Sequence, residues 1–150
     1  MLYRKVFKNR GFSLIEVVVS IGIFSLLLTM SAPFFVGFYK SYQLRSEKNL
    51  LLSVLAEARN RSISGQGPTN YNYGVAIDPI EIVLFTAIDA LRNPALDEGF
   101  ARNASISITG SSYSSFLRLS GITSPATYVL TYDNLQETVT INSEGSVDWQ

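Results

Sequence analysis

The distribution of apolar residues divides the chain into stretches with different patterns. Residues 12–39 read FSLIEVVVSIGIFSLLLTMSAPFFVGFY and are apolar on every helical face, with Glu16 as the one acidic side chain. The 22 residues from Val17 to Phe38 carry no charge, and a bilayer's hydrocarbon core requires about 20 apolar residues in a helix. A buried helix of a soluble protein is the alternative, but such a helix is usually apolar along one stripe. The pattern therefore predicts a membrane-spanning helix.

After Tyr39 the pattern becomes amphipathic up to about Ile63. One stripe carries apolar or small side chains, namely Leu44, Leu51, Leu55, Ala58 and Ser62, with Val54 beside it. We therefore expect one helix of about 50 residues, from about Ser13 to Ile63, whose second half packs on a domain. The run Ser64-Gly65-Gln66-Gly67-Pro68 ends this helix, because glycine and proline both interrupt helices.

Residues 69–150 contain the short β-branched and aromatic runs that are typical of strands. The predicted strands cover residues 73–77, 81–87, 105–109, 115–119, 128–132, 138–141 and 146–149. Turns are expected at Ser120-Gly121 and at Asn142-Ser143-Glu144-Gly145. Residues 88–103 are predicted to be irregular, with a short helical turn near Ala90-Leu91. A long helix followed by a meandering antiparallel sheet predicts an α+β fold.

Composition excludes several kinds of chemistry. The chain has no Cys and no His, which removes the commonest nucleophile–base pairs, zinc sites and disulfides. Only 16% of its residues are charged, below the roughly 25% of a typical soluble domain. This low fraction favours a lipid-facing segment or a surface that binds partners.

The distribution of charge is uneven although the formal net charge is zero. Arg4, Lys5, Lys8 and Arg10 lie in the first eleven residues, and the remaining chain, with eight basic and twelve acidic residues, has a formal charge of −4. A basic flank before an apolar helix favours a cytoplasmic N-terminus, so we expect the C-terminal domain on the far side of the membrane.

A specific motif lies where the basic flank meets the apolar run. Residues Lys8-Asn9-Arg10-Gly11-Phe12-Ser13-Leu14-Ile15-Glu16 combine a basic leader, a Gly–Phe junction and an acid at a fixed offset. The motif resembles the N-terminal segment of type IV prepilins and pseudopilins, over about residues 5–40. The resemblance implies that a prepilin peptidase cuts between Gly11 and Phe12 and methylates the new amino group of Phe12. An ordinary signal peptide is disfavoured, because Pro33 would lie beside the small-residue cut.

Glu16 would lie about 6 Å along the helix from the new N-terminus, at the helical rise of about 1.5 Å per residue. An acid in hydrocarbon costs roughly 2.5–3.5 kcal/mol and is usually paired and functional. The resemblance implies that Glu16 pairs with the amino group of Phe12 in a neighbouring subunit and sets the axial stagger. A carboxylate that only reaches the headgroups is the alternative. Pro33 marks either a bend used in assembly, as the resemblance implies, or a tolerated kink.

We therefore expect four segments. They are a cleaved leader (residues 1–11), a transmembrane and filament-core helix (12–39), its amphipathic continuation (40–64) and a β-rich globular domain (69–150). The expected function is that of a structural subunit and not of an enzyme. The subunit would be a minor pilin or pseudopilin, similar to the H-type pseudopilins of type II secretion. The machine, whether type IV pilus, type II secretion or competence, stays open.

The expected partners follow from the resemblance. They are other pilin or pseudopilin subunits, prepilin peptidase, an inner-membrane assembly platform and membrane lipid. The expected place is the bacterial inner membrane and then the filament, with the C-terminal domain periplasmic or extracellular. A monomeric membrane-anchored extracellular binding domain is the second hypothesis. An anchored hydrolase that uses only Asp, Glu and Tyr is a remote third.

The remaining candidate sites are weaker. Asp97-Glu98 would bind Ca²⁺ only weakly, and a solvated loop is favoured because no spaced series of acids supplies six oxygens. Five tyrosines form either an adhesive face or, as we favour, part of the packed sheet: Tyr71, Tyr73, Tyr113, Tyr128 and Tyr132. Residues 69–150 hold three arginines against nine acids, so nucleic acid is not an expected partner. No cofactor or metal is expected.

Overall fold

The structure is a computed structural model that describes residues 11–67, 71–88 and 91–150. The side chains of residues 31–34, 88 and 91 also lie outside this description. One helix, α1, runs from Leu14 to Ile63 over 50 residues, which confirms the predicted helix. The chain divides into two compact units, residues 1–38 and residues 39–150.

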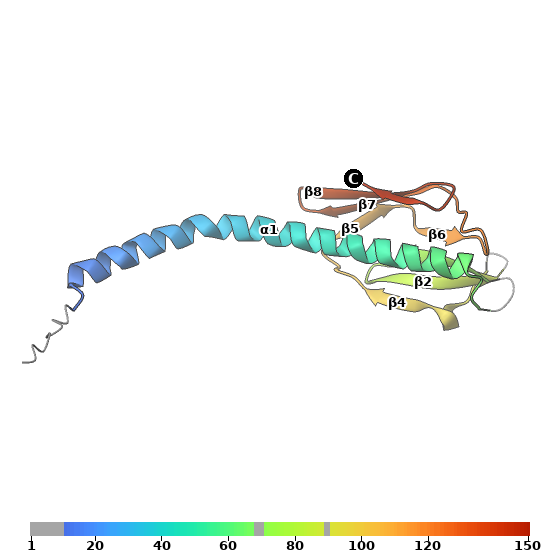
Figure 1. Cartoon of the computed structure of the whole chain (residues 1–150), viewed down its shortest axis with the longest axis horizontal. Coiled ribbons are helices and arrows are strands. Elements are labelled where there is room, and N and C mark those ends of the chain that lie inside the picture. The colour runs from blue at the N-terminus through green and yellow to red at the C-terminus, as the bar shows by residue number, and fades with distance from the viewer. Residues whose placement is uncertain (1–10, 68–70, 89–90) are drawn as a thin grey trace, which may run out of the picture. The chain divides into compact units, whose positions relative to one another are not determined.

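Two antiparallel sheets and one short 3₁₀ helix follow α1 (Figure 1). The first sheet contains β1 (Tyr71–Ile77), β2 (Glu81–Ile88), β3 (Leu91–Arg92), β4 (Glu98–Ala101) and β6 (Tyr113–Phe116). Its order is β3-β2-β1-β6, and β4 also pairs with β2. The second sheet has the order β5-β7-β8-β9 and contains β5 (Ser107–Gly110), β7 (Ala126–Tyr132), β8 (Leu135–Ile141) and β9 (Val147–Trp149). The fold class is therefore α+β, with two sheets instead of the single meandering sheet expected.

The second half of α1 packs against both sheets and closes the hydrophobic core. Figure 1 shows these turns running alongside strands of the two sheets. The stripe predicted from the sequence is buried throughout, with Leu51, Leu55 and Ala58 at 0% exposure. Phe116 of β6 and Tyr128 of β7 meet this stripe in the same cluster. The hydroxyl groups of Ser114 and Tyr128 lie 2.6 Å apart in a hydrogen bond that joins the two sheets inside the core.

Ion pairs supplement this packing where α1 begins to contact the sheets. Lys40 pairs with Asp133 at 2.5 Å, and this carboxylate raises the pKa of Lys40 through a hydrogen bond. Lys48 pairs with Glu137 of β8 at 2.9 Å. Both pairs lie before Leu51, in the part of the helix where Leu44 and Glu47 are the buried side chains.

Three local predictions were wrong. The segment expected to be irregular holds β3 and β4, and Leu91 lies in β3 and not in a helical turn; Ala90 lies outside the described residues. The short helix is instead η1 (Pro94–Leu96), whose first turn is capped by the Asn93 side chain accepting from the Ala95 amide at 3.2 Å. β4 is exposed and lacks β-branched residues, so its extended form comes from pairing with β2 and not from its own propensity.

The third error concerns the strand predicted over residues 115–119. β6 covers Tyr113–Phe116, and the chain then turns. Leu119 has a φ of 65° and Gly121 a φ of 68°, and the Gly121 amide donates to the Leu117 carbonyl at 2.8 Å. A left-handed residue cannot continue a strand, which explains the earlier end. The turn predicted at residues 142–145 is present, with Gly145 at a φ of 75°.

Candidate functional site

The motif at the start of the helix lies at a junction between exposed, non-helical chain and α1. Gly11, Phe12 and Ser13 precede the helix and are exposed. The Ser13 carbonyl accepts from the amides of Glu16 at 3.0 Å and Val17 at 3.2 Å, so Ser13 is the residue from which the helical bonds start. The Gly11–Phe12 bond therefore lies outside the helix, at exposed residues.

The chain's own packing does not explain the glycine at position 11. A Cβ atom built at Gly11 would meet no atom within 4 Å. Another residue would fit there without a clash, so any requirement for glycine comes from outside this chain. Close approach of an enzyme to an unbranched backbone is one such requirement.

Glu16 lies in the first turn of α1 with its side chain exposed. An acid at this end of a helix interacts favourably with the positive end of the helix dipole, by about 0.3–1 kcal/mol in exposed positions. This effect keeps the carboxylate compatible with the helix start. Because the Glu16 side chain is exposed, its carboxylate oxygens are accessible to a cation of another molecule.

The large apolar side chains around and after Glu16 are exposed, from 46% at Val17 to 83% at Phe12. α1 holds an 18-residue window that is long and apolar enough to cross a membrane, and none of that window is buried. Exposed apolar surface on this scale is not stable in water, so lipid or other helices must cover it. Residue Pro33 lies within the bounds of α1, but its side chain is among those not described, so the bend expected there stays a prediction.

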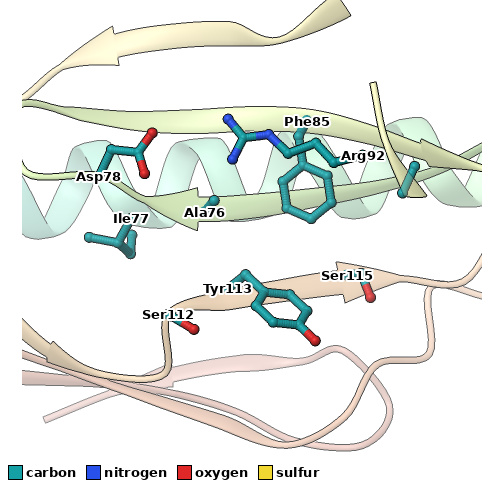
Figure 2. A pocket seen from close by; sticks show the side chains of 9 residues that line it. Ala76, Ile77, Asp78, Phe85, Arg92, Ser112, Tyr113 and Ser115 are labelled. Atoms are coloured by element: carbon teal, nitrogen blue, oxygen red, sulfur yellow. The ribbon is translucent and has the colours of Figure 1, made fainter. Parts of the chain in front are cut away.

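A second candidate site lies on the face of the first sheet that points away from α1. In Figure 2 the helix passes behind the strands, and the side chains that line a groove lie in front of them. The register places Gly74 of β1 between Phe85 of β2 and Ser115 of β6, and places Ala76 opposite Tyr113. A cavity of about 520 Å³ lies over Ala76, with the rings of Phe85 and Tyr113 from the neighbouring strands in its lining.

Charged side chains stand at one wall of this groove. The Arg92 guanidinium lies 5.5 Å above the centre of the Phe85 ring. Its Nε donates to Asp97 Oδ2 at 2.8 Å, and its Nη2 lies 2.6 Å from the same oxygen in an ion pair. The hydrogen bond to Asp97 is the largest cause of a raised pKa for Arg92. Asp78 also lines the groove, and its charge and that of Glu81 raise the same pKa further.

The structure does not bring together the residues of the other candidate sites, the acidic pair and the five tyrosines. Asp97 pairs with Arg92 and Glu98 pairs with Arg61, so this acidic pair is divided between two arginines. Among the described residues no group of three or more side chains is arranged to hold a metal ion. Of the five tyrosines, Tyr73 and Tyr128 are buried in the core, whereas Tyr113 is 63% exposed at the groove. The shared adhesive face is therefore not formed, and packing explains the two buried rings.

Comparison with known proteins concerns the N-terminal segment. Residues 6–32 match the family model described as the prokaryotic N-terminal methylation motif. This match supports a place for the chain among type IV prepilins and pseudopilins, whose motif is processed by prepilin peptidase and whose members are structural subunits. The motif and the apolar helix fit a membrane-anchored pilin that assembles with other pilin subunits. No curated protein and no solved structure matches the chain.

Proposed function

We propose that the chain is a minor pilin or pseudopilin, inserted with its N-terminus in the cytoplasm and built into a filament or its initiating tip through α1. The match of residues 6–32 to the methylation motif carries this proposal. In it, prepilin peptidase removes residues 1–11 and methylates Phe12. The retained helix then anchors the subunit in the bilayer until an assembly platform extracts it. A type II secretion subunit of the H-type is the narrower form of the proposal.

The length of the exposed apolar stretch supports the anchor. The 22 uncharged residues from Val17 to Phe38 would extend over roughly 33 Å as a helix. The hydrocarbon core of a bilayer is about 30 Å thick. In the proposed filament the same side chains would contact neighbouring helices instead of lipid. Pro33 would allow α1 to bend or melt locally during that transfer, because proline removes one helical hydrogen bond.

The carboxylate of Glu16 supplies the register in this proposal. It pairs with the amino group of Phe12 in the adjacent subunit. That amine is free only after hydrolysis of the Gly11–Phe12 peptide bond, which leaves a carboxylate on Gly11 and the amine on Phe12. A lone polar pair in an apolar seam favours a single alignment, since every other alignment leaves a charge unpaired. Uncleaved subunits lack that amine at Phe12 and would therefore be excluded from the filament.

Substitution of Glu16 tests the proposal. Glu16→Gln keeps the shape and removes the charge, and we expect filament incorporation at equal protein level to fall about tenfold, as loss of about 1.4 kcal/mol per contact predicts. Thr29→Val is the matched control, because it removes a polar group of the same helix whose hydroxyl donates back to the Leu26 carbonyl at 2.8 Å. Incorporation of Glu16→Gln at the level of the control would refute the register role.

A further inference from the structure

We propose that the groove over Ala76, between the Phe85 and Tyr113 rings, binds the cationic side chain, lysine or arginine, of a partner polypeptide. The groove belongs to the domain and not to the membrane helix, so the inference does not depend on leader cleavage or on filament assembly. It applies equally to a pilin subunit and to a monomeric anchored domain.

The groove is a consequence of strand register. A Cβ atom at Gly74 would lie 2.4 Å from Phe85 Cζ and 2.6 Å from the Ser114 carbonyl oxygen, so the Phe85 ring lies flat across this glycine. Ala76 continues the floor, and the Tyr113 ring stands on the other side of β1. Figure 2 shows Arg92 and Asp78 on the β2 side and Tyr113 on the β6 side, with the floor between them.

The charges around the groove leave a negative excess. Among the described residues that line the groove, Arg92 is the one basic side chain, and Asp97 already lies against two of its nitrogens. Asp78 lines the groove as well, and Glu81 lies near enough to raise the pKa of Arg92. With the charge of Arg92 matched by Asp97, the carboxylate of Asp78 is the natural counter-ion for an added cation.

The aromatic walls favour the same kind of ligand. The Arg92 guanidinium above the Phe85 ring is already a cation–π contact in this groove. Tyr113 offers a second ring, 63% exposed. The negative face of such a ring attracts ammonium and guanidinium groups by about 0.5–1 kcal/mol at exposed sites. A lysine or arginine can therefore lay its alkyl stem on Ala76 and Tyr113 and direct its charge toward Asp78.

A polypeptide fits the groove better than a free small cation. The groove lies on an open sheet face, whereas small-molecule sites bury about 70–90% of the ligand. A small cation would leave much of its surface in water and bind weakly. A polypeptide can add main-chain contacts along β6, which lies at the edge of the first sheet, around the same anchoring side chain.

Binding of short peptides to the ¹⁵N-labelled full chain in detergent micelles tests the inference. The probe is an acetylated and amidated Gly-Lys-Gly peptide, and its Gln counterpart and methylammonium are the comparisons. We expect the Lys peptide to shift the amide signals of Ala76, Asp78 and Tyr113 and to bind at least tenfold more tightly than either comparison. Equal binding of the Gln peptide would overturn the charge requirement, and equal binding of methylammonium would overturn the polypeptide requirement.

Two variants distinguish binding at this groove from general electrostatic attraction between the peptide and the chain. Asp78→Asn and Tyr113→Ala should each weaken the Lys peptide at least fivefold. The control is Asp148→Asn, which makes the same charge change at an exposed position of β9 in the other sheet. Unchanged affinity in Asp78→Asn, or an equal loss in Asp148→Asn, would overturn the inference.

Discussion

Ser62, in the last turn of α1, donates its hydroxyl hydrogen to the carbonyl oxygen of Phe116 at 3.1 Å, across 54 residues of sequence. The same hydroxyl accepts from the backbone amide of Tyr73 at 3.2 Å. One side chain with 0% exposure therefore connects α1 to both β1 and β6. Because water cannot reach this position, the three groups depend on one another for their hydrogen bonds.

Loss of this hydroxyl should destabilise the domain. Ser62→Ala leaves the Tyr73 amide and the Phe116 carbonyl short of a partner, and we expect the free energy of unfolding to fall by about 1–3 kcal/mol. Urea denaturation of the chain in detergent micelles measures this change. Ser53→Ala is the control, because Ser53 is exposed and its hydroxyl donates to the Leu50 carbonyl of its own helix. A control that loses as much stability as Ser62→Ala would contradict the account.

The pair of Glu47 and Arg102 is the most buried ion pair of the domain among the described residues, at 6% and 5% side-chain exposure. Their Oε1 and Nε atoms are 3.4 Å apart, and the other Glu47 oxygen accepts from the Asn103 amide at 3.1 Å. Removing one partner of a buried pair leaves an uncompensated charge. We expect Glu47→Gln to lower the free energy of unfolding by about 3–5 kcal/mol.

A double-mutant cycle checks that expectation. Glu47→Gln combined with Arg102→Leu should cost less than the sum of the two single changes, since the double variant carries no unpaired charge. The matched control is Glu57→Gln on the same helix, whose exposed pair with Arg61 is worth at most about 1 kcal/mol. Strictly additive losses at Glu47 and Arg102 would show that the two charges do not interact.

The pair of Glu98 and Arg61 gives a pH dependence with a defined sign. The hydrogen bond from Arg61 lowers the pKa of Glu98 from its ordinary value of 4.5. A lowered folded-state pKa stabilises the fold above the ordinary value, and this stabilisation is lost as the pH falls through the folded-state pKa. Since Glu98 is 49% exposed, solvent and salt screening limit the effect to about 1 kcal/mol.

The comparison of Glu98→Gln with the unmodified chain measures this effect. We expect the unmodified chain to be more stable by up to about 1 kcal/mol at pH 6, and we expect the difference to vanish as the pH falls through the lowered folded-state pKa of Glu98. Glu144→Gln, at an exposed turn, serves as the control and should show no such convergence. A difference that grows as the pH falls would reverse the sign and refute the assignment.

The sequence was most informative where one short-range pattern decides the structure. The helix and its buried stripe from Leu44 to Ser62 could be predicted because a period of 3.6 residues is visible in the sequence itself. The motif around Gly11 and Phe12 is likewise local. Glu47 could not be predicted to be buried on that stripe. Its carboxylate depends on Arg102, 55 residues away, and no local pattern indicates that pairing.

The groove could not be predicted because it depends on strand pairing. Gly74 lies beside Phe85 and Ser115 only in the observed register, and a shift by one residue would turn the small residues toward the helix. The sequence shows the small residues of β1, but it does not show which residues of β2 and β6 lie beside them. β4 was missed for a related reason, because Glu98 to Ala101 becomes a strand only through β2.

The intact mass of the protein, purified from cells with a working prepilin peptidase, tests the central claim most directly. We predict the loss of residues 1–11 and the gain of one methyl group on Phe12, and we predict the full-length mass when the peptidase is absent. A mature protein that keeps its leader while other pilins in the same cells are processed would contradict the account.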